Sequence, residues 1–321
     1  MVLYMQSSID VVGVGLNATD TLIVVPGMPS YGGKTPFTDE VVSVGGQVAS
    51  AMVTCQKLGL RSKYIGSIGD DERGKVQLES LKQSGVDIEH VQIRERCANQ
   101  SAYIVIDQTT GERTVFWHRD ECLRIRPEQI KTEQITCARL LHVDGHDTEA
   151  ITHAAHIAKQ AAIPVTADVD TIYPGLEKVL PKIDYLIAST EFPSSWTREQ
   201  NPFIALKKIR KEYKMQVTAM TLGGDGCLAL NDDGFHYAPG FVVDCIDTTG
   251  AGDVFHGAFC YALLKDYNLD QTLEFSNAMA AINCRALGAR GCIATREDAE
   301  QLIDQGERYI NQDFMDAAEC L

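Results

Sequence analysis

The sequence lacks the features that direct a protein into a membrane, out of the cell or onto a nucleic acid. No apolar run is long enough to span a bilayer, and residues 1–10 contain no basic stretch followed by an apolar segment. Basic residues are few, because 29 Lys and Arg stand against 44 Asp and Glu, for a formal charge of −15. Such an acidic chain is poorly suited to nucleic acids and anionic membranes. We expect a cytoplasmic protein that binds neither.

Cysteines with metal-binding spacing are also missing. No Cys-x-x-Cys occurs among the ten cysteines, so neither a zinc ribbon nor a thioredoxin-like motif is expected. The even count is compatible with disulfides. Against that interpretation, the chain is long, several cysteines lie in apolar patterns, and no export signal is present. We therefore expect reduced thiols.

The sequence does contain a regular alternation of strand-like and helix-like stretches, and 45% of its 321 residues are hydrophobic. Strands are predicted at 9–14, 62–67, 140–143, 164–168, 185–188 and 216–222. Helices are predicted at 48–58, 75–84, 149–161, 202–213, 251–265, 271–287 and 296–310. This order predicts an α/β fold, a doubly wound and mostly parallel sheet flanked by helices.

Two stretches interrupt the alternation. Residues 21–44 contain short strand-like pieces around prolines and glycines, and residues 101–117 contain two β-rich runs joined by a turn at 107–111. Neither stretch has room for a helix. They predict a small β-sheet lid, built from about 16–44 and 98–119 and inserted in a single domain that spans 1–321.

The most informative motif is Asp247-Thr-Thr-Gly-Ala-Gly-Asp253, which leads from a strand-like run at 240–245 into an apolar helix. Unpaired N–H groups at a helix N-terminus attract anions, and the glycines let an anion approach closely. Asp253 then lies in the first helical turn, where it could take a proton from an attacking hydroxyl. The same residues would also suit an ordinary strand–helix turn, with Asp253 serving the helix dipole.

This stretch resembles the C-terminal signature of the ribokinase-like (PfkB) carbohydrate kinases, and the resemblance extends through nearly the whole chain. Similar blocks occur in order at 45–47, 57–59, 65–74, 221–226, 277–278 and 288–290. The resemblance implies the ribokinase-like fold and ATP-dependent phosphorylation of a sugar hydroxyl. One departure is Ala188, which stands where many members have the asparagine of an Asn-x-x-Glu motif. In this departure the chain resembles the ketohexokinase-like and sulfofructose-kinase-like branches more than ribokinase itself.

By resemblance, Asp253 is the catalytic base, and the N–H groups of Gly250, Ala251 and Gly252 form the anion hole for the transferred phosphoryl group. Asp247 corresponds to the ligand of a monovalent cation such as K⁺. The implied sugar-binding residues are Asn17, Asp20, Gly46, Gln47 and Ser50. Arg119, at the end of the second lid run, would suit an anionic substituent of the sugar, or else be a solvated lid charge. The implied ATP-side residues are Thr221, Gly223, Gly226 and Asn277, with Glu191 holding Mg²⁺ through water.

Three alternatives remain open. A nucleoside kinase of the same fold would carry the same motifs, and so would a catalytically silent sensor of sugars or nucleotides. A dinucleotide-dependent oxidoreductase is less favoured, because Gly13-x-Gly15 has no third glycine that opens a helix. Since an exposed accessory sheet often needs covering, we expect a homodimer formed through the lid.

Overall fold

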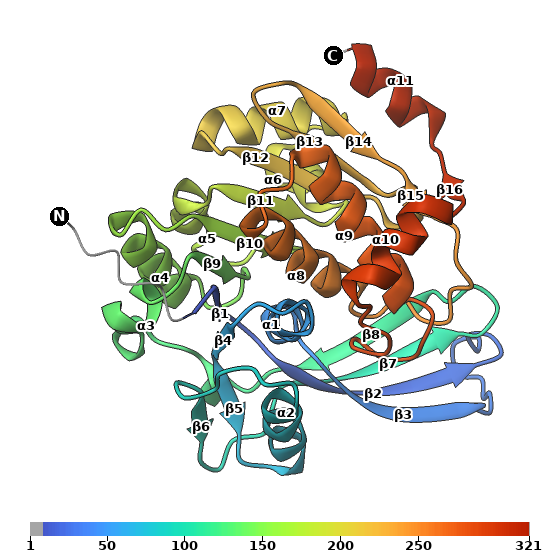
Figure 1. The fold of residues 1–321 in the computed structure, drawn as a ribbon. Coiled ribbons are helices and arrows are strands. Elements are labelled where there is room, and N and C mark those ends of the chain that lie inside the picture. Colours follow the sequence, from blue (N-terminus) through green and yellow to red (C-terminus); the bar gives the residue numbers. More distant parts are fainter. Residues whose placement is uncertain (1–8, 321) are drawn as a thin grey trace.

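The computed structural model describes residues 9–320, and its centre is an eight-stranded sheet (Figure 1). The strand order is β14-β13-β12-β11-β10-β9-β1-β4. All neighbours are parallel except the β12–β13 and β13–β14 pairs, which are antiparallel. The strands are β1 (Val11–Val14), β4 (Ser62–Ile65), β9 (Leu140–Val143), β10 (Val165–Val169), β11 (Tyr185–Ala188), β12 (Val217–Thr221), β13 (Cys227–Leu230) and β14 (Phe235–Ala238). The predicted mostly parallel sheet is confirmed.

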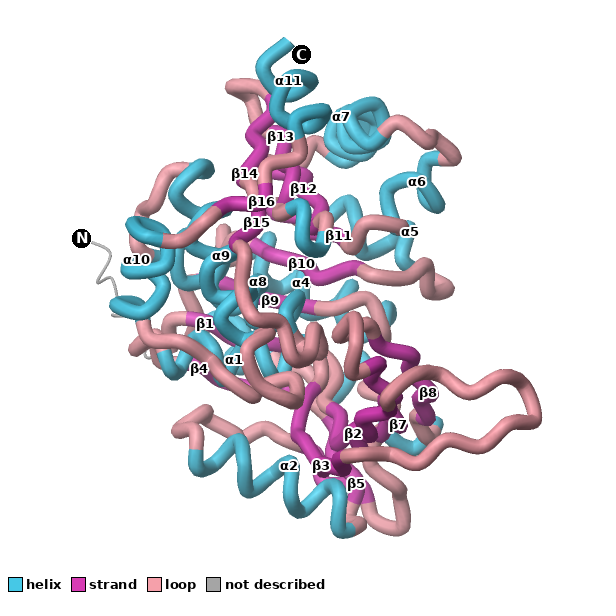
Figure 2. Tube along the Cα trace, turned by 90° about the vertical axis from the view of Figure 1, so that its right-hand side faces the viewer, coloured by secondary structure: helices cyan, strands magenta, loops and turns pink. Residues whose placement is uncertain are grey.

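Helices cover both faces of this sheet (Figure 2), as the two largest hydrophobic clusters show. One face carries α3 (Thr132–Thr136), α4 (Thr148–Gln160), α5 (Leu176–Val179), α6 (Phe192–Thr197) and α7 (Pro202–Tyr213). The other carries α1 (Gln47–Lys57), α8 (Ala251–Leu264) and α9 (Leu269–Asn283), with α10 (Arg296–Gln305) packed on α9. The last helix, α11 (Gln312–Cys320), lies against β14 at the sheet edge.

A second sheet has four strands in the order β3-β2-β7-β8 and corresponds to the predicted lid strands. They are β2 (Ala18–Val25), β3 (Asp39–Gly45), β7 (Ser101–Asp107) and β8 (Arg113–His118). Alternation along β7 buries Ala102, Ile104 and Ile106 toward the body and leaves Tyr103 exposed on the outer face. In Figures 1 and 2 this sheet stands apart from the central sheet, beside α2 (Glu72–Gln83) and the short pair β5 (Ser67–Gly69) and β6 (Gln92–Arg94).

The lid begins at the point in the central sheet where the order of strand addition reverses. β1 pairs with β4 on one side and with β9 on the other, so the chain leaves the carboxyl ends of β1 and β9 in opposite directions. Ligands of open α/β sheets bind at such a switch point. Here the ends are followed by residues 15–17, which lead into β2, and by Asp144.

Several predicted elements end earlier than expected or are divided, and the helix predicted at 271–287 ends at Asn283. The helix predicted at 296–310 ends at Gln305, because Gly306 is extended and the next residues form β16 (Arg308–Tyr309), paired with β15 (Gly240–Phe241). That pairing also shortens the strand predicted at 240–245. The strand predicted at 62–67 is divided at Gly66 into β4 and β5. No helix within 9–320 is long and apolar enough to cross a membrane.

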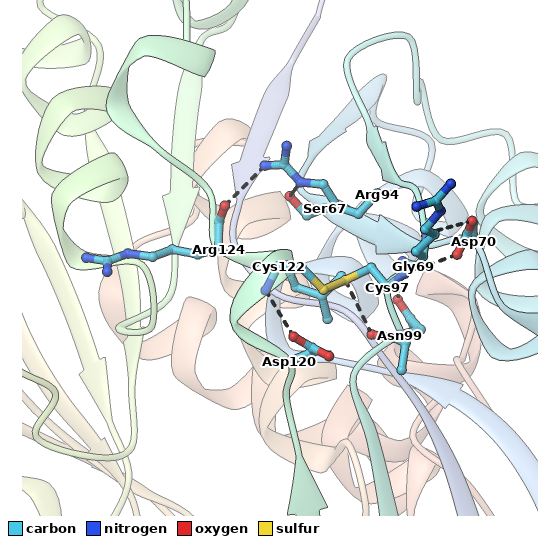
Figure 3. The surroundings of a disulfide bond; sticks show 12 residues. Ser67, Gly69, Asp70, Arg94, Cys97, Asn99, Asp120, Cys122 and Arg124 are labelled. Atoms are coloured by element: carbon cyan, nitrogen blue, oxygen red, sulfur yellow. Dashed lines mark hydrogen bonds between the residues drawn. A yellow bond between two sulfur atoms is a disulfide. The ribbon is translucent and has the colours of Figure 1, made fainter.

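The expectation of reduced thiols is wrong for one pair of cysteines. Cys97 and Cys122 form a disulfide, with Cα atoms 6.1 Å apart (Figure 3). One lies before β7 and the other after β8, so pairing of these strands brings the two cysteines together although 25 positions separate them. The bond closes the base of the β7–β8 hairpin.

Candidate active site

The turn before α8 gathers backbone N–H groups at one point. Gly250 caps the helix with a φ of 74°, and a Cβ atom there would lie 2.4 Å from the Cα of Ala289. Only glycine fits both conditions. Within the described residues, the N–H groups of Gly250, Gly252 and Asp253 make no hydrogen bond, whereas that of Ala251 donates to a turn carbonyl at 3.3 Å. Free donors at a helix N-terminus suit an anion.

Asp253 lies beside these donors in the first turn of α8 and is half-buried. Burial and the negative charge of Asp168 raise the pKa of its carboxyl to about 7, although His256, Arg290 and Arg113 oppose this shift. A carboxyl with a pKa near neutrality is suited to accept a proton from a hydroxyl.

Two buried residues behind Asp253 were not part of the predicted site. His256 lies one helical turn after Asp253, and its Nε2 is 3.2 Å from Oδ1 of Asp168 in β10. Burial alone would raise the pKa of Asp168, but the contact with His256 lowers it. The spacing of three residues along the helix was the available signal, since it puts His256 and Asp253 on one face.

Asp20 lies beside Gly45, which precedes Gly46 and the start of α1. Oδ1 of Asp20 accepts a hydrogen bond from the N–H of Ala102 at 3.0 Å, and burial raises the pKa of this carboxyl to about 6. Gly46 has a φ of 94°, and a Cβ atom on it would lie 2.4 Å from the Cα of Asn17. Gln47 is the first residue of α1. The carboxyl of Asp20 and the start of α1 therefore lie close together where the lid joins the central sheet.

Asn17 is held by the protein itself. Its Nδ2 donates to the hydroxyl of Tyr64 at 3.0 Å and to the carbonyl of Ser67 at 2.7 Å. Its Oδ1 accepts from Nδ2 of Asn99 at 3.1 Å. Both amide protons are thus in use, and the side chain fixes the root of the lid rather than pointing a free donor at a ligand.

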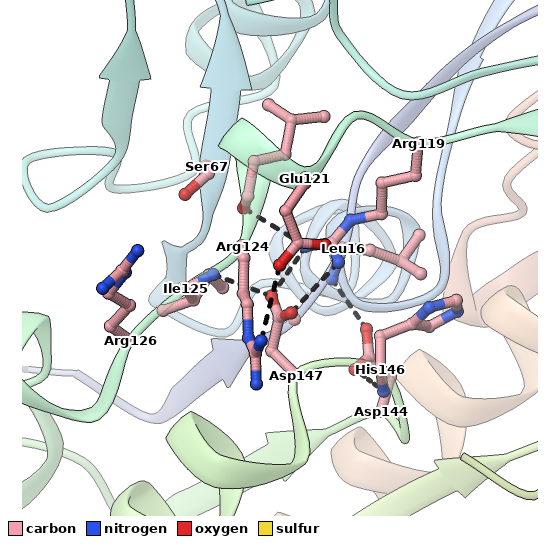
Figure 4. Close-up of polar contacts among 12 residues, drawn as sticks. Leu16, Ser67, Arg119, Glu121, Arg124, Ile125, Arg126, Asp144, His146 and Asp147 are labelled. Carbon is pink, nitrogen blue, oxygen red and sulfur yellow. Dashed lines mark hydrogen bonds and ion pairs between the residues drawn. The ribbon is translucent and has the colours of Figure 1, made fainter. Parts of the chain in front are cut away.

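Arg119 is also held by the protein, in a buried ion pair (Figure 4). Its Nη1 and Nη2 donate to the two carboxylate oxygens of Asp147 at 3.0 and 2.6 Å, and Nη2 also donates to the carbonyl of Leu123. Burial would lower the pKa of Arg119, but the pair with Asp147 raises it. The side chain joins the end of the lid to the loop after β9.

Asp144 follows β9 at the switch point and was also absent from the predicted site. Its Oδ2 accepts from the N–H of Leu16 at 2.7 Å and its Oδ1 from the N–H of His146 at 3.0 Å (Figure 4). Burial raises the pKa of this carboxyl to about 6. Its place directly after the predicted strand 140–143 was the signal in the sequence.

Ser50 is covered by Arg290. Nε of Arg290 donates to Oγ of Ser50 at 3.1 Å, and its other nitrogens donate to Oγ of Ser80 and to the carbonyl of Gly45. Burial lowers the pKa of this guanidinium to about 10. Ala289 touches both the Gly45 position and the Gly250 turn, so the segment 288–290 lies between the predicted sugar side and the anion hole.

The lid itself reaches the turn before α8. Nη1 of Arg113, on β8, donates to Oγ1 of Thr248 at 2.6 Å. The sequence places these residues 135 positions apart. This contact brings a positive charge from the lid beside the free N–H groups.

The predicted nucleotide-side residues lie on two neighbouring loops and one helix: Thr221, Gly223, Gly226, Asn277 and Glu191. The two loops are joined, because Oγ1 of Thr190 donates to the carbonyl of Thr221 at 2.7 Å. The side chain of Glu191 is exposed and has no hydrogen bond within the described part of the chain. Asn277 on α9 donates to the carbonyls of Ala238, the last residue of β14, and of Pro239, at 2.9 and 3.2 Å.

The surroundings of Asp247 do not fit the monovalent cation that the resemblance implied. Asp247 is fully buried, and its Oδ1 accepts from the N–H of Thr249 at 2.9 Å and from its hydroxyl at 2.7 Å. Its Oδ2 accepts from the N–H of Gly288 at 2.8 Å. Three protein donors thus already occupy most of the acceptor positions of this carboxylate.

The chain matches a known protein family. Residues 10–296 match the family described as pfkB family carbohydrate kinase. The chain is 27% identical over 278 residues to an ATP-dependent ribose-1-phosphate kinase of Halopiger xanaduensis, covering 84% of this chain and 90% of that protein. It is 25% identical to a ribokinase of Haemophilus influenzae, over 94% of this chain and 99% of that protein.

A solved structure has the same fold. The crystal structure of a putative ribokinase from Agrobacterium tumefaciens superposes with a TM-score of 0.85 and 27% identity, and covers 92% of this chain and 98% of that one. The predicted ribokinase-like fold is therefore confirmed.

Proposed function

The chain belongs to the pfkB family of carbohydrate kinases, and from that membership we propose that it transfers the γ-phosphoryl group of ATP to a hydroxyl of a sugar or sugar derivative. Asp253 is the general base. The open N–H groups at the start of α8 hold the phosphoryl group during transfer.

The reaction balances within this arrangement. Asp253 takes the proton from the sugar hydroxyl, the hydroxyl oxygen forms a bond to the γ-phosphorus, and the bond from that phosphorus to the β,γ-bridging oxygen breaks to release ADP. Such donors at the developing charge contribute about 3–4 kcal/mol each. Proton transfer to a positioned base contributes about 10²–10⁴ in rate.

One observation carries the proposal: the carboxyl with a pKa of about 7 lies in the same helical turn as the free N–H donors. A carboxylate beside an anion site binds that anion poorly, so its presence there suits proton transfer rather than binding. No step of the proposal uses a monovalent cation.

The binding sites follow from the elements around this turn. We place the sugar between the lid and the carboxyl ends of β1 and β9, with Asp20, Gly46 and Gln47 as its contacts, whereas the predicted contact Ser50 is fully buried under Arg290 and supports the site from behind. Asn17 and Arg119, whose polar groups bond the protein, position the neighbouring residues. We place ATP at the loops after β11 and β12, beside Asn277. Glu191 has a free carboxylate that fits Mg²⁺ bound through water, and Mg²⁺ would neutralise the triphosphate.

A coupled ADP-release assay with ATP and Mg²⁺ tests the proposal. The panel holds ribose, fructose, tagatose, 2-keto-3-deoxygluconate, sulfofructose, their phosphorylated forms and nucleosides. We expect ADP release that depends on one sugar class. Because one relative is named for ribose-1-phosphate, anionic sugars belong in the panel on equal terms with neutral ones.

Two other results would replace the proposal. Release of ADP with adenosine alone would identify a nucleoside kinase of the same fold. Binding of ATP by calorimetry without turnover of any compound would favour a silent sensor.

We also propose a homodimer formed through the lid. Val42, Tyr103 and Phe116 form one row across the outer face of the sheet, since Thr21 of β2 pairs with Val42 and Tyr103, and Tyr103 pairs with Phe116. These three apolar side chains are 60%, 54% and 60% exposed. Exposed apolar rows on a sheet mark interaction surfaces.

A cytoplasmic location stays a prediction.

A further inference from the structure

Asn283, the last residue of α9, is a fully buried amide that joins three segments of the active site. Its Nδ2 donates to the carbonyls of Thr249 and Ala289, both at 3.3 Å. Its Oδ1 accepts from the N–H of Cys292 at 3.3 Å. The partners fix the orientation of the amide, because carbonyls only accept hydrogen bonds and a backbone N–H only donates one.

Protein donors already bond the oxygens that surround this amide. The carbonyl of Cys284 accepts from the N–H groups of Ile246 and Asp247, at 2.8 and 3.2 Å. Asp247 accepts three hydrogen bonds of its own, as described above. A cation that joins the turn to the segment after α9 would need several of these oxygens as ligands. The carbonyls of Thr249 and Ala289 converge on one point, and the Asn283 amide nitrogen occupies it.

The place of this amide connects it to the free N–H groups. Thr249 directly precedes Gly250, and the backbone of Ala289 packs against Gly250 so closely that a Cβ atom there would lie 2.3 Å from the Ala289 carbonyl oxygen. By bonding both carbonyls, Asn283 holds the two sides of this contact together. The position of the anion hole then depends on a neutral side chain.

We propose that Asn283 performs the task of the monovalent cation, so that this kinase orders its anion hole without K⁺ or Na⁺. Asn283 is a positioning residue, since it contacts neither the proposed phosphoryl group nor the base. The structural part of the inference concerns the turn alone, and only its kinetic consequence rests on the proposed function.

Thermal unfolding of the free protein in KCl, NaCl and choline chloride at equal ionic strength tests the structural part without any substrate. We expect the Tm of the unmodified protein to agree among the three salts within about 1 °C, because a ligand that does not bind cannot stabilise the fold. A Tm that rises by more than about 2 °C in K⁺ or Na⁺ relative to choline would overturn the proposal.

Asn283→Asp gives the converse test. It keeps the shape of the side chain but sets carboxylate oxygen against two carbonyl oxygens, an arrangement that a cation relieves. We expect its Tm to be lower than that of the unmodified protein in choline and to recover in part in KCl or NaCl. The control is Asn268→Asp at the other end of α9, where aspartate caps a helix as well as asparagine does. Absence of any cation response in folded Asn283→Asp would contradict the proposal.

The kinetic consequence is read separately, once a substrate is known. Turnover of the unmodified kinase should change by less than about twofold when choline replaces K⁺, and a drop of about tenfold would overturn the proposal. If Asn283→Asp does not fold, the salt comparison on the unmodified protein decides alone. If no sugar is phosphorylated, the proposed function fails while the Tm comparison still tests the cation.

Discussion

Asp253 is subject to opposing influences. Its place in the first turn of α8 favours the charged form through the helix dipole, and Arg290 and Arg113 act in the same direction. Burial and the charge of Asp168 act against them and are stronger, so the pKa rises to about 7. The residue therefore exchanges its proton in the pH range where a kinase operates.

This shift predicts the pH dependence of catalysis. The base form of Asp253 predominates above pH 7, and each unit below that value should lower kcat/KM about tenfold. The measurement is kcat/KM for the sugar between pH 5 and 9 with ATP saturating. A kcat/KM that stays level down to pH 5, as expected for an aspartate with the ordinary pKa of 3.8, would show that the environment of Asp253 is not the one described.

Asp168→Asn provides the matched comparison. It keeps the side-chain shape but removes the negative charge that helps to raise the pKa of Asp253. The inflection of kcat/KM should therefore move to lower pH. An unchanged inflection would mean that burial alone sets this pKa, or that another group titrates.

At the scale of elements, the β7–β8 hairpin contacts the catalytic turn at its tip and is closed by a disulfide at its base. At its tip, Arg113 bonds Thr248 before α8. At its base, the Cys97–Cys122 disulfide closes the hairpin (Figure 3). Hydrogen bonds from the N–H of Gly69 to Asn99 and from the N–H of Cys97 to Asp70 join this base to the end of β5. The hairpin is thus the element through which lid position and anion-hole geometry are coupled.

Removal of the disulfide should destabilise the fold. Cys97→Ser is expected to lower the free energy of unfolding by about 2–4 kcal/mol, because the bond restricts the unfolded chain across this hairpin. Urea unfolding without reductant measures it. Cys245→Ser, at an exposed free cysteine, is the control and should have little effect. Equal stability of the two variants would contradict the bond. So would a titration in which all ten cysteines of the unfolded, unreduced protein react as free thiols.

At the scale of the whole molecule, the sequence predicted those parts of the fold that depend on local hydrophobic pattern. Strand–helix alternation predicted the parallel part of the central sheet, and the interruptions of that alternation predicted the lid. The spacing of apolar residues along a segment shows which of its faces are buried, and in a layered fold those faces are the ones that pack against the neighbouring layer. The β13–β14 hairpin and β16 were missed, since short antiparallel strands at an edge carry little periodic signal.

Side-chain partners were the part that local pattern could not supply. Arg119 was predicted at the lid end, but its partner Asp147 lies 28 positions away and is brought near only by the folded loop after β9. The same holds for Asn283 and Thr249, and for Cys97 and Cys122. The prediction of Asp253 needed no distant partner, because the free N–H groups that define it lie in the same helical turn.

The exposed apolar row on the lid, formed by Val42, Tyr103 and Phe116, predicts a dimer. The protein should be a dimer by light scattering, and Phe116→Glu should convert it to a monomer by placing a charge in the apolar row. Ile204→Glu is the control, since Ile204 is also exposed but lies on α7, on the body of the molecule. A monomeric unmodified protein, or dissociation by both variants alike, would count against the lid interface.

The most direct measurement is the turnover of Asp253→Asn with the sugar identified by the panel, beside ATP affinity by calorimetry. Asp266→Asn, at the exposed end of α8, is the matched control. Because burial raises the pKa of folded Asp253 above its unfolded value, its charge costs stability above pH 7, so the Asn variant should not unfold earlier at pH 8. The assignment of the base predicts that kcat falls about 10²–10⁴-fold while ATP affinity stays within about threefold. A folded Asp253→Asn that keeps more than about a tenth of the turnover would contradict it.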